Sequence, residues 1–430
     1  MYFCYKNDVL FWLEADLNKL CLEIETLLEN KYRYNGPYYV YHADILRKRL
    51  QLTAKTLPKS RFFYSVKSLS NIHILKIIKE YENFGLDVVS EGEILRGILA
   101  DFEGKDIVFA GVGKKRSEII FGLEKNIKSF HVESIEELKK IAEIALSLGK
   151  TASVALRVNP NIEADTHEYI KTGLDENKFG LSSNEFTLAL EIIRESSSLN
   201  LNGLQTHLGS QIKDSKPYKD ALALLVNLAG IVKEKLSKPV DYLSLGGGFG
   251  IDYESSLKDI TANDFSLKEI ADYELYKNSE YQIDFEPGRF ISGYSGILVS
   301  KVLYLKEKKD FIIAVVDSGM TDLIRPALYK AKHPILTVKK RNEAKAIYDI
   351  AGPICESSDY LAKKIELTEL KQNDRLAVLH CGAYASTMGS NYNSRPLAPE
   401  FLIEEDKVIL IRKPQSLDEM LTLEISANKA

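Results

Sequence analysis

A lysine, a histidine and a glutamate each stand at the end of a short apolar segment of this sequence. Lys67 follows the segment FFYSV, His207 follows GLQT, and Glu286 closes QIDFE. A lysine kept from bulk water has a lowered pKa and can form a Schiff base with a carbonyl group. An imidazole can stack on a planar ring, and a carboxylate can pair with a protonated ring nitrogen. Together the three residues indicate a site for a planar carbonyl cofactor.

The glycine run Gly246–Gly250 also follows an apolar segment, DYLSL. Glycines after a strand allow backbone N–H groups to approach a phosphate closely, and Arg289 could pair with the same phosphate or with a substrate carboxylate. The run is not G-x-G-x-x-G and no P-loop Lys-Ser/Thr follows it, so neither a dinucleotide nor a nucleoside triphosphate is indicated. A phosphate site, a Schiff-base lysine, a stacking ring and a carboxylate are what pyridoxal phosphate requires.

These residues need a framework that brings distant strand ends together. Eight segments have the composition of strands: 62–66, 86–89, 107–110, 128–132, 152–158, 203–207, 241–245 and 282–286. Segments with helical spacing alternate with them: 72–83, 91–100, 115–124, 134–148, 183–195, 215–237 and 265–276. The alternation predicts a parallel (β/α)8 barrel, with a doubly wound open sheet as the alternative. In such a barrel the chemistry lies at the carboxyl ends of the strands, where the residues above are found.

The pattern changes after residue 290. Short strand-like segments follow one another without long helices between them: 296–304, 311–316, 334–338, 346–350, 375–379 and 407–411. This predicts a second, mainly antiparallel β-domain, built as a β-barrel or a sandwich. Because Val9–Trp12 is a plausible strand, we expect residues 1–35 to join 291–430 in this domain and residues 36–290 to form the barrel.

Composition excludes several classes of protein. The 430 residues carry 57 Lys+Arg and 61 Asp+Glu, a net charge of −4, which disfavours nucleic-acid binding. Four cysteines (Cys4, Cys21, Cys355 and Cys381) without C-x-x-C spacing predict neither a disulfide framework nor a zinc site. The histidines form no H-E-x-x-H pattern, so no metal is predicted. With no signal-peptide pattern and no long apolar run, we expect a cytoplasmic protein without a membrane span.

Longer motifs carry a family resemblance. FYSVK at 63–67, HLGSQ at 207–211, GGGFG at 246–250 and EPGR at 286–289 resemble the barrel-type (fold type III) pyridoxal-phosphate decarboxylases. DSGMTDLIRPALY at 317–329, GPICESSD at 352–359 and GAYASTMGSNYNSRP at 382–396 are similar to the diaminopimelate decarboxylase family. The motifs occur in collinear order over residues 36–415. The sequence departs from the family pattern at Leu69, Thr387 and Gly389, and at His42 before the barrel, but at none of the named catalytic groups.

The resemblance implies a role for each matching residue. Lys67 would bond to the cofactor, His207 would stack on its ring, and Glu286 would keep its pyridine nitrogen protonated. The other cofactor-binding residues, most of them at the phosphate, would be Ser210, Gly247, Gly248, Gly288, Arg289 and Tyr384. Cys355 would be the acid that protonates the carbon from which CO2 departs. The distal end of the substrate would be held by Arg289, Arg325, Tyr329, Glu356 and Tyr384.

The implied reaction is decarboxylation of meso-2,6-diaminopimelate to L-lysine and CO2, the last step of lysine biosynthesis, in a homodimer. Cys355 and Glu356 would reach into the partner subunit's site. The unreacted end of this substrate needs cations for its carboxylate and an anion for its ammonium, which Arg289, Arg325 and Glu356 offer. The alternatives are a related decarboxylase of another diamino or carboxylated-amine substrate, a catalytically silent relative, and an alanine-racemase-like activity.

Overall fold

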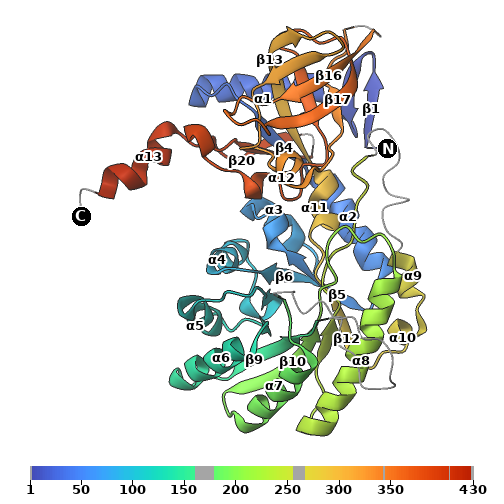
Figure 1. Ribbon diagram of the computed structural model, residues 1–430, viewed down its shortest axis with the longest axis vertical. Coiled ribbons are helices and arrows are strands. Elements are labelled where there is room, and N and C mark those ends of the chain that lie inside the picture. The colour runs from blue at the N-terminus through green and yellow to red at the C-terminus, as the bar shows by residue number, and fades with distance from the viewer. Residues whose placement is uncertain (1, 160–178, 255–266, 342–343, 406, 428–430) are drawn as a thin grey trace. The chain divides into compact units, whose positions relative to one another are not determined.

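The computed structural model describes residues 2–159, 179–254, 267–341, 344–405 and 407–427 (Figure 1). The chain divides into two compact units. The barrel unit holds the described residues of Lys48–Ile251 and Phe265–Phe290. The β unit holds those of Met1–Arg47, Asp252–Asp264 and Ile291–Ala430.

Eight parallel strands close the barrel unit into a ring in the order β10-β11-β12-β5-β6-β7-β8-β9. They are β5 (Ser60–Ser65), β6 (Phe84–Val88), β7 (Ile107–Phe109), β8 (Ser129–Val132), β9 (Ala152–Arg157), β10 (Leu199–Gln205), β11 (Tyr242–Ser244) and β12 (Gln282–Phe285). Each overlaps a segment predicted from the sequence. The closed ring confirms the barrel and shows that the open-sheet alternative is wrong.

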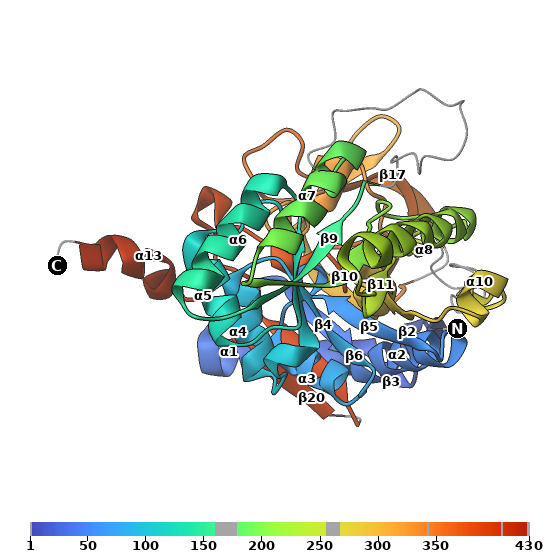
Figure 2. The same cartoon turned by 90° about the horizontal axis from the view of Figure 1, so that it is seen from below.

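Helices surround these strands (Figure 2). They are α3 (Ile72–Lys79), α4 (Glu91–Leu99), α5 (Arg116–Glu124), α6 (Ile135–Ser147), α7 (Ser183–Glu195), α8 (Lys216–Leu236), α9 (Leu267–Ala271) and α10 (Glu274–Lys277), with the short 3-10 helices η1 (Val66–Ser68) and η2 (Gly104–Asp106). Because strands of a parallel barrel are buried on both faces, their sequences are almost continuously apolar. Phe62, for example, is fully buried and stacks on Phe84 and Phe285 of the neighbouring strands, with ring centroids 4.9 and 6.1 Å away.

The β unit contains a three-stranded sheet, β1 (Phe3–Lys6), β2 (Val9–Trp12) and β3 (Ala15–Asp16), and a nine-stranded sheet. The strands of the larger sheet are β4 (Tyr38–His42), β13 (Gly296–Glu307), β14 (Ile312–Val316), β15 (Ile335–Thr337), β16 (Lys345–Ala351), β17 (Tyr360–Thr368), β18 (Arg375–Val378), β19 (Glu400–Glu404) and β20 (Lys407–Arg412). β14 pairs with β16, and β4 with β19, in parallel; the other pairings are antiparallel. The mainly antiparallel domain is therefore confirmed.

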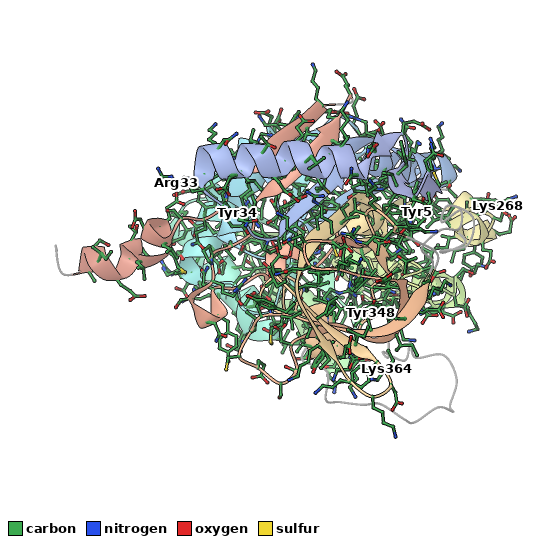
Figure 3. The ribbon with its side chains drawn as sticks, turned by 90° about the horizontal axis from the view of Figure 1, so that it is seen from above. Tyr5, Arg33, Tyr34, Lys268, Tyr348 and Lys364 are labelled. Carbon is green, nitrogen blue, oxygen red and sulfur yellow. The ribbon has the colours of Figure 1, made fainter. Side chains whose placement is uncertain are left out.

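Five further α-helices lie in the described residues: α1 (Leu17–Tyr32), α2 (Ala43–Thr56), α11 (Arg289–Ser292), α12 (Arg325–Tyr329) and α13 (Leu417–Ser426). The remaining 3-10 helices there are η3 (Gly293–Ser295), η4 (Ser386–Met388) and η5 (Tyr392–Ser394). Arg33, with φ 50°, ends α1 (Figure 3). Strand β2 is joined to the rest of the β unit by the hydrogen bond from Leu10 N–H to the Val338 carbonyl, 2.9 Å. No helix among the described residues is long and apolar enough to cross a membrane.

Two segments lie on the other side of the domain boundaries drawn from the sequence: residues 36–47 and the described residues of 252–264. Strand β4, at Tyr38–His42, falls within the range 36–290 assigned to the barrel, but it pairs with β13 and β19 of the β unit. Every residue of β4 is buried, as in a central strand, and its apolar sequence alone does not say which sheet it joins. The remaining domain boundaries stay a prediction.

Candidate active site

The loops that follow β5, β10, β11 and β12 meet at one end of the barrel unit. Gly247 N–H donates to His207 Nδ1 at 3.2 Å, and Arg289 Nη2 donates to Ser210 Oγ at 3.3 Å. Glu286 N–H donates to the Gly246 carbonyl at 2.8 Å. Residues predicted from separate strand ends are thus joined by direct hydrogen bonds, as closure of the barrel requires.

Lys67 lies in η1, directly after β5, and forms an ion pair with Asp87 of β6. Its Nζ atom is 2.8 Å from Asp87 Oδ2, which also accepts a hydrogen bond from Ser65 Oγ at 2.8 Å. Burial opposes ionisation of Asp87, but the attraction of the Lys67 ammonium and these hydrogen bonds outweigh it and lower the pKa of the carboxyl. Asp87 therefore holds the amine of Lys67 in place.

We expect Asp87→Asn to lower the free energy of unfolding by about 1–2 kcal/mol, because it leaves the Lys67 ammonium without its anion. This is less than for a fully buried pair, since 36% of the Lys67 side chain is exposed. Because the pKa of Asp87 is depressed, its stabilisation is present above the model value of 3.8 and is lost as the pH falls through the lower pKa of the folded state. Urea unfolding of both proteins between pH 5 and about pH 7 should therefore give a constant difference; a difference that shrinks across this range contradicts the assignment.

Glu286 is 4% exposed, and donors reach both of its carboxylate oxygens. Ser244 Oγ donates to Oε1 at 2.6 Å, and Gln205 Nε2 donates to Oε2 at 2.9 Å. Burial raises the pKa of Glu286 to about 8, and the carboxylate of Asp87 adds to the shift. A carboxyl group with this pKa is largely neutral near pH 7. A nearby positive charge, such as a protonated ring nitrogen, favours its ionised form.

His207 presents a neutral ring at the same end of the barrel. Burial, with the nearby positive charges of Lys67 and Arg157, lowers its pKa to about 4. Its Nδ1 atom accepts a hydrogen bond from Gly247, so the remaining ring proton of the neutral imidazole is on Nε2. A flat, uncharged ring in a defined orientation suits stacking on a planar cofactor.

Positions 247 and 248 must be glycine because other backbone segments pass very close to them. A Cβ atom on Gly247 would lie 2.2 Å from the Glu286 carbonyl oxygen. One on Gly248, where φ is +94°, would lie 2.5 Å from the Gly209 carbonyl oxygen. Any side chain at these positions would separate the loops after β10, β11 and β12. A Cβ atom on Gly288 would lie 3.0 Å from the Cβ atom of Ser65.

Three polar residues of this site were not predicted from the sequence: Asp87, Gln205 and Ser244. Each is buried in or at the end of an apolar strand. Their position in apolar strand segments could have identified them from the sequence. A buried polar side chain needs a hydrogen-bond partner, so it implies a polar network inside the barrel.

The other predicted residues lie in the β unit. Arg325 begins α12 and is buried, with Nη1 2.9 Å from His333 Nε2 and its guanidinium 4.4 Å from the Tyr253 ring centroid. Tyr329 ends the same helix and is 62% exposed. Cys355 and Glu356 occupy the exposed turn between β16 and β17, and Tyr384, with φ 55°, follows β18. Their relation to the barrel loops stays a prediction.

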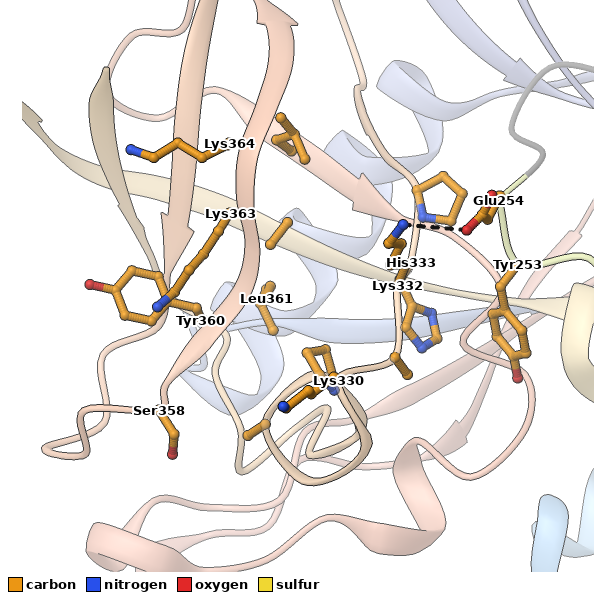
Figure 4. Close-up of a pocket in the computed structure, with 16 residues that line it drawn as sticks. Tyr253, Glu254, Lys330, Lys332, His333, Ser358, Tyr360, Leu361, Lys363 and Lys364 are labelled. Carbon is orange, nitrogen blue, oxygen red and sulfur yellow. Dashed lines mark hydrogen bonds and ion pairs between the residues drawn. The ribbon is translucent and has the colours of Figure 1, made fainter. Parts of the chain in front are cut away.

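The β unit also contains a cavity of about 840 Å³ (Figure 4). It lies beside α12 and β17, and Lys332 on its wall pairs with Glu254 at 3.4 Å. Although α12 carries Arg325 and Tyr329, none of the residues predicted for the active site lines this cavity. Cavity volume is therefore a poor guide to the site in this chain.

Comparison with known proteins shows similarity over nearly the whole chain. Residues 43–293 match the family described as pyridoxal-dependent decarboxylase, pyridoxal binding domain. The diaminopimelate decarboxylase of Aquifex aeolicus is 38% identical, covering 95% of this chain and 96% of that protein. That of Haemophilus influenzae is 40% identical, covering 95% and 97%. The structure of M. jannaschii diaminopimelate decarboxylase with L-lysine has a TM-score of 0.87 at 32% identity, covering 98% and 97%.

Proposed function

The chain belongs to the pyridoxal-dependent decarboxylases, in the diaminopimelate decarboxylase family, and we propose that it converts meso-2,6-diaminopimelate to L-lysine and CO2 as the last step of lysine biosynthesis. The cofactor is pyridoxal 5'-phosphate. The observation that carries the proposal is the cluster at one end of the barrel, in which Lys67, His207 and Glu286 stand within one set of hydrogen-bonded loops.

The residues of this cluster fit pyridoxal phosphate. Lys67 offers an amine beside a buried carboxylate, and His207 offers a neutral ring face. The loop Gly246–Gly250, Ser210 and Arg289 would surround the phosphate, although the Gly247 N–H is donated to His207 in this structure. When bound, the cofactor supplies an electron sink for the carbanion left by CO2. Glu286, whose pKa is raised by burial, would lie at the ring nitrogen, keep it protonated and pair with it as a carboxylate.

The remaining residues would hold the substrate and move the final proton. Arg289 and Arg325 would bind the distal carboxylate, with Tyr329 and Tyr384 beside it, and Glu356 would bind the distal ammonium. Cys355 would donate its thiol proton to the substrate α-carbon after CO2 has left. Because Cys355 and Glu356 would serve the partner subunit's site, the active form would be a homodimer. We also propose that the protein is cytoplasmic.

The direct test is incubation of the cofactor-loaded protein with meso-diaminopimelate, with L-lysine and CO2 measured together. We expect equal amounts of both products and much slower reaction with ornithine or carboxynorspermidine, which lack a distal amino-acid group. Full cofactor occupancy without lysine formation would refute the proposal. Racemisation without CO2 release would instead indicate the alanine-racemase-like alternative.

Arg325→Met should separate recognition of the distal carboxylate from the chemistry. L-Lysine retains that carboxylate, whereas cadaverine does not. We expect the KM for diaminopimelate and the inhibition constant of L-lysine both to rise about tenfold or more, because a charge-assisted contact is lost. The inhibition constant of cadaverine should stay within about threefold, which steady-state inhibition assays can measure. A parallel rise for cadaverine would show that Arg325 acts on the fold of the site and not on the carboxylate.

Cys355→Ala should lower kcat by about 10²- to 10³-fold while the KM for diaminopimelate changes little, because a positioned acid acts only in the proton transfer. Since Cys355 is exposed, its replacement should change the free energy of unfolding by less than about 0.5 kcal/mol. Steady-state kinetics and urea unfolding measure the two effects. Unaltered turnover would contradict the acid role, and Cys4→Ala is the matched control for removing a thiol.

A further inference from the structure

His131 is a buried titratable residue to which the proposed mechanism gives no role. It stands in β8, is 0% exposed, and its ring lies between Glu286 of the β12 loop and Tyr242 of β11. His131 Nδ1 faces Glu286 Oε1 at 3.5 Å, and Nε2 is 3.2 Å from Tyr242 Oη. Among the described residues Nδ1 has no hydrogen-bond partner, so a small shift toward Glu286 would complete one.

The position of this ring is closely determined by its surroundings. A Cβ atom on Gly203 would lie 2.4 Å from Tyr242 Cζ, so only glycine lets Tyr242 occupy the barrel interior. Lys128 Nζ lies 3.9 Å from the Tyr242 ring centroid and pairs with Asp284 Oδ2 at 2.8 Å. The ring of His131 therefore cannot turn away from Glu286 without moving Tyr242.

Charged groups around the ring favour its neutral form. Burial lowers the pKa of His131 to about 3, opposed by the carboxylate of Asp87. The positive side chains that add to the lowering are Lys114, Lys128 and Arg157. Glu286 itself is faced by Asp87, Lys67, Ser244 and Gln205. His131 thus keeps one ring proton near pH 7, and that proton can be on either nitrogen.

The two tautomers match the two protonation states of Glu286. With the proton on Nδ1, His131 donates to the Glu286 carboxylate and accepts from the Tyr242 hydroxyl at Nε2. With the proton on Nε2, His131 donates to the Tyr242 oxygen and accepts the O–H of neutral Glu286 at Nδ1. A hydroxyl both donates and accepts, so Tyr242 serves either arrangement by rotating its O–H bond.

We propose that His131 is a positioning residue that stabilises Glu286 both as a neutral acid and as a carboxylate by moving its single ring proton between Nδ1 and Nε2. The inference rests on the proposed function, in which Glu286 changes from acid to carboxylate when the cofactor binds. In that step the O–H proton of Glu286 would pass to the ring nitrogen of the cofactor. The Nε2–H bond of His131 would break and an Nδ1–H bond would form, so the imidazole keeps one proton and donates it to the new carboxylate.

The test titrates Glu286 in the full-length, cofactor-free protein by the infrared carboxyl band that Glu286→Gln removes. In the unsubstituted protein we expect a midpoint near the value of about 8 given by burial. His131→Phe keeps a ring but removes the hydrogen bond of either tautomer. Because the bond to the carboxylate is charge-assisted and the stronger of the two, the midpoint should rise by about one unit, a tenfold change in the ionisation equilibrium. His131→Asn places an amide near the position of Nδ1 and should restore the midpoint to within about 0.3 units.

A second readout is the dissociation constant of pyridoxal phosphate, measured by equilibrium dialysis. It should rise about tenfold in His131→Phe and less than about threefold in His131→Asn. If His131→Phe does not fold, Tyr242→Phe removes the partner of Nε2 and should raise the midpoint by about half a unit. An unchanged midpoint in the folded variant, or equal shifts for Phe and Asn at residue 131, overturns the inference. A shift in a protein that makes no lysine would support the role of His131 and refute the proposed function.

Discussion

Lys67→Ala should reduce decarboxylation by about 10⁴-fold or more, the largest effect expected for any single substitution in this chain. In the proposed function the amine of Lys67 would be the nucleophile that bonds to the carbonyl of the cofactor, and no other described lysine pairs with Asp87. The visible absorbance of covalently bound pyridoxal phosphate should disappear with the activity. Lys67→Arg, which keeps the positive charge but has no reactive amine, should lose both as well.

Lys67→Ala should also destabilise the fold. This effect separates the role of Lys67 in the ion pair with Asp87 from its role as the nucleophile. Removing the ammonium leaves Asp87, 1% exposed, as a buried carboxylate without its partner, and we expect a loss of about 1–3 kcal/mol. In Lys67→Ala/Asp87→Asn the stability should largely return, because the uncompensated charge is gone, while activity stays absent. Denaturant unfolding of the four proteins of this cycle measures the coupling. Additive losses in the double variant would show that the ion pair does not hold Lys67 in place.

Glu286→Gln should lower kcat by about 10²- to 10³-fold and leave the covalent absorbance of the cofactor intact. An amide can accept a hydrogen bond from the ring nitrogen but cannot balance its positive charge, so the electron sink is weakened. Loss of activity with retained absorbance therefore distinguishes this variant from Lys67→Ala. Asp284→Asn is the matched control, since Asp284 is a buried carboxylate on β12, two residues before Glu286, and pairs with Lys128 instead. We expect it to lower stability but to change kcat by less than about threefold.

The stability of the cofactor-free protein gives an independent check on Glu286. Burial raises its pKa from the model value of 4.5 to about 8, so the folded state holds a proton that the unfolded chain has already lost. Stability then falls as the pH rises through this window. Glu286→Gln lacks this dependence, and its stability relative to the unsubstituted protein should increase between pH 4.5 and pH 8. A pH-independent difference would mean that the carboxyl is ionised throughout.

Strands could be predicted from the sequence where a short segment by itself showed the expected pattern of apolar residues. The eight barrel strands were recognised because each is a short apolar run bounded by polar residues, a pattern that the burial of both faces requires. Strand β17 was missed because Lys363, Lys364 and Glu366 are exposed and interrupt its apolar residues. Strand β19 was missed as well, although all but its last residue are buried. Strand β4 was also missed, and its residues were placed within the barrel range, because local pattern does not say which sheet such a segment joins.

The kind of chemistry and the candidate residues at the strand ends could be predicted from the amino-acid sequence, because a motif is read along the chain and a strand end is a local feature. Which side chains meet depends on the tertiary fold. Parallel register places Asp87 beside Ser65, two residues before Lys67, and so gives the lysine its anion. Closure of the ring brings His131 of β8 to Glu286 after β12, 155 residues away in the chain. Such partners depend on how strands pair and on the curvature that closes the barrel, and neither is encoded in the spacing of residues along one segment.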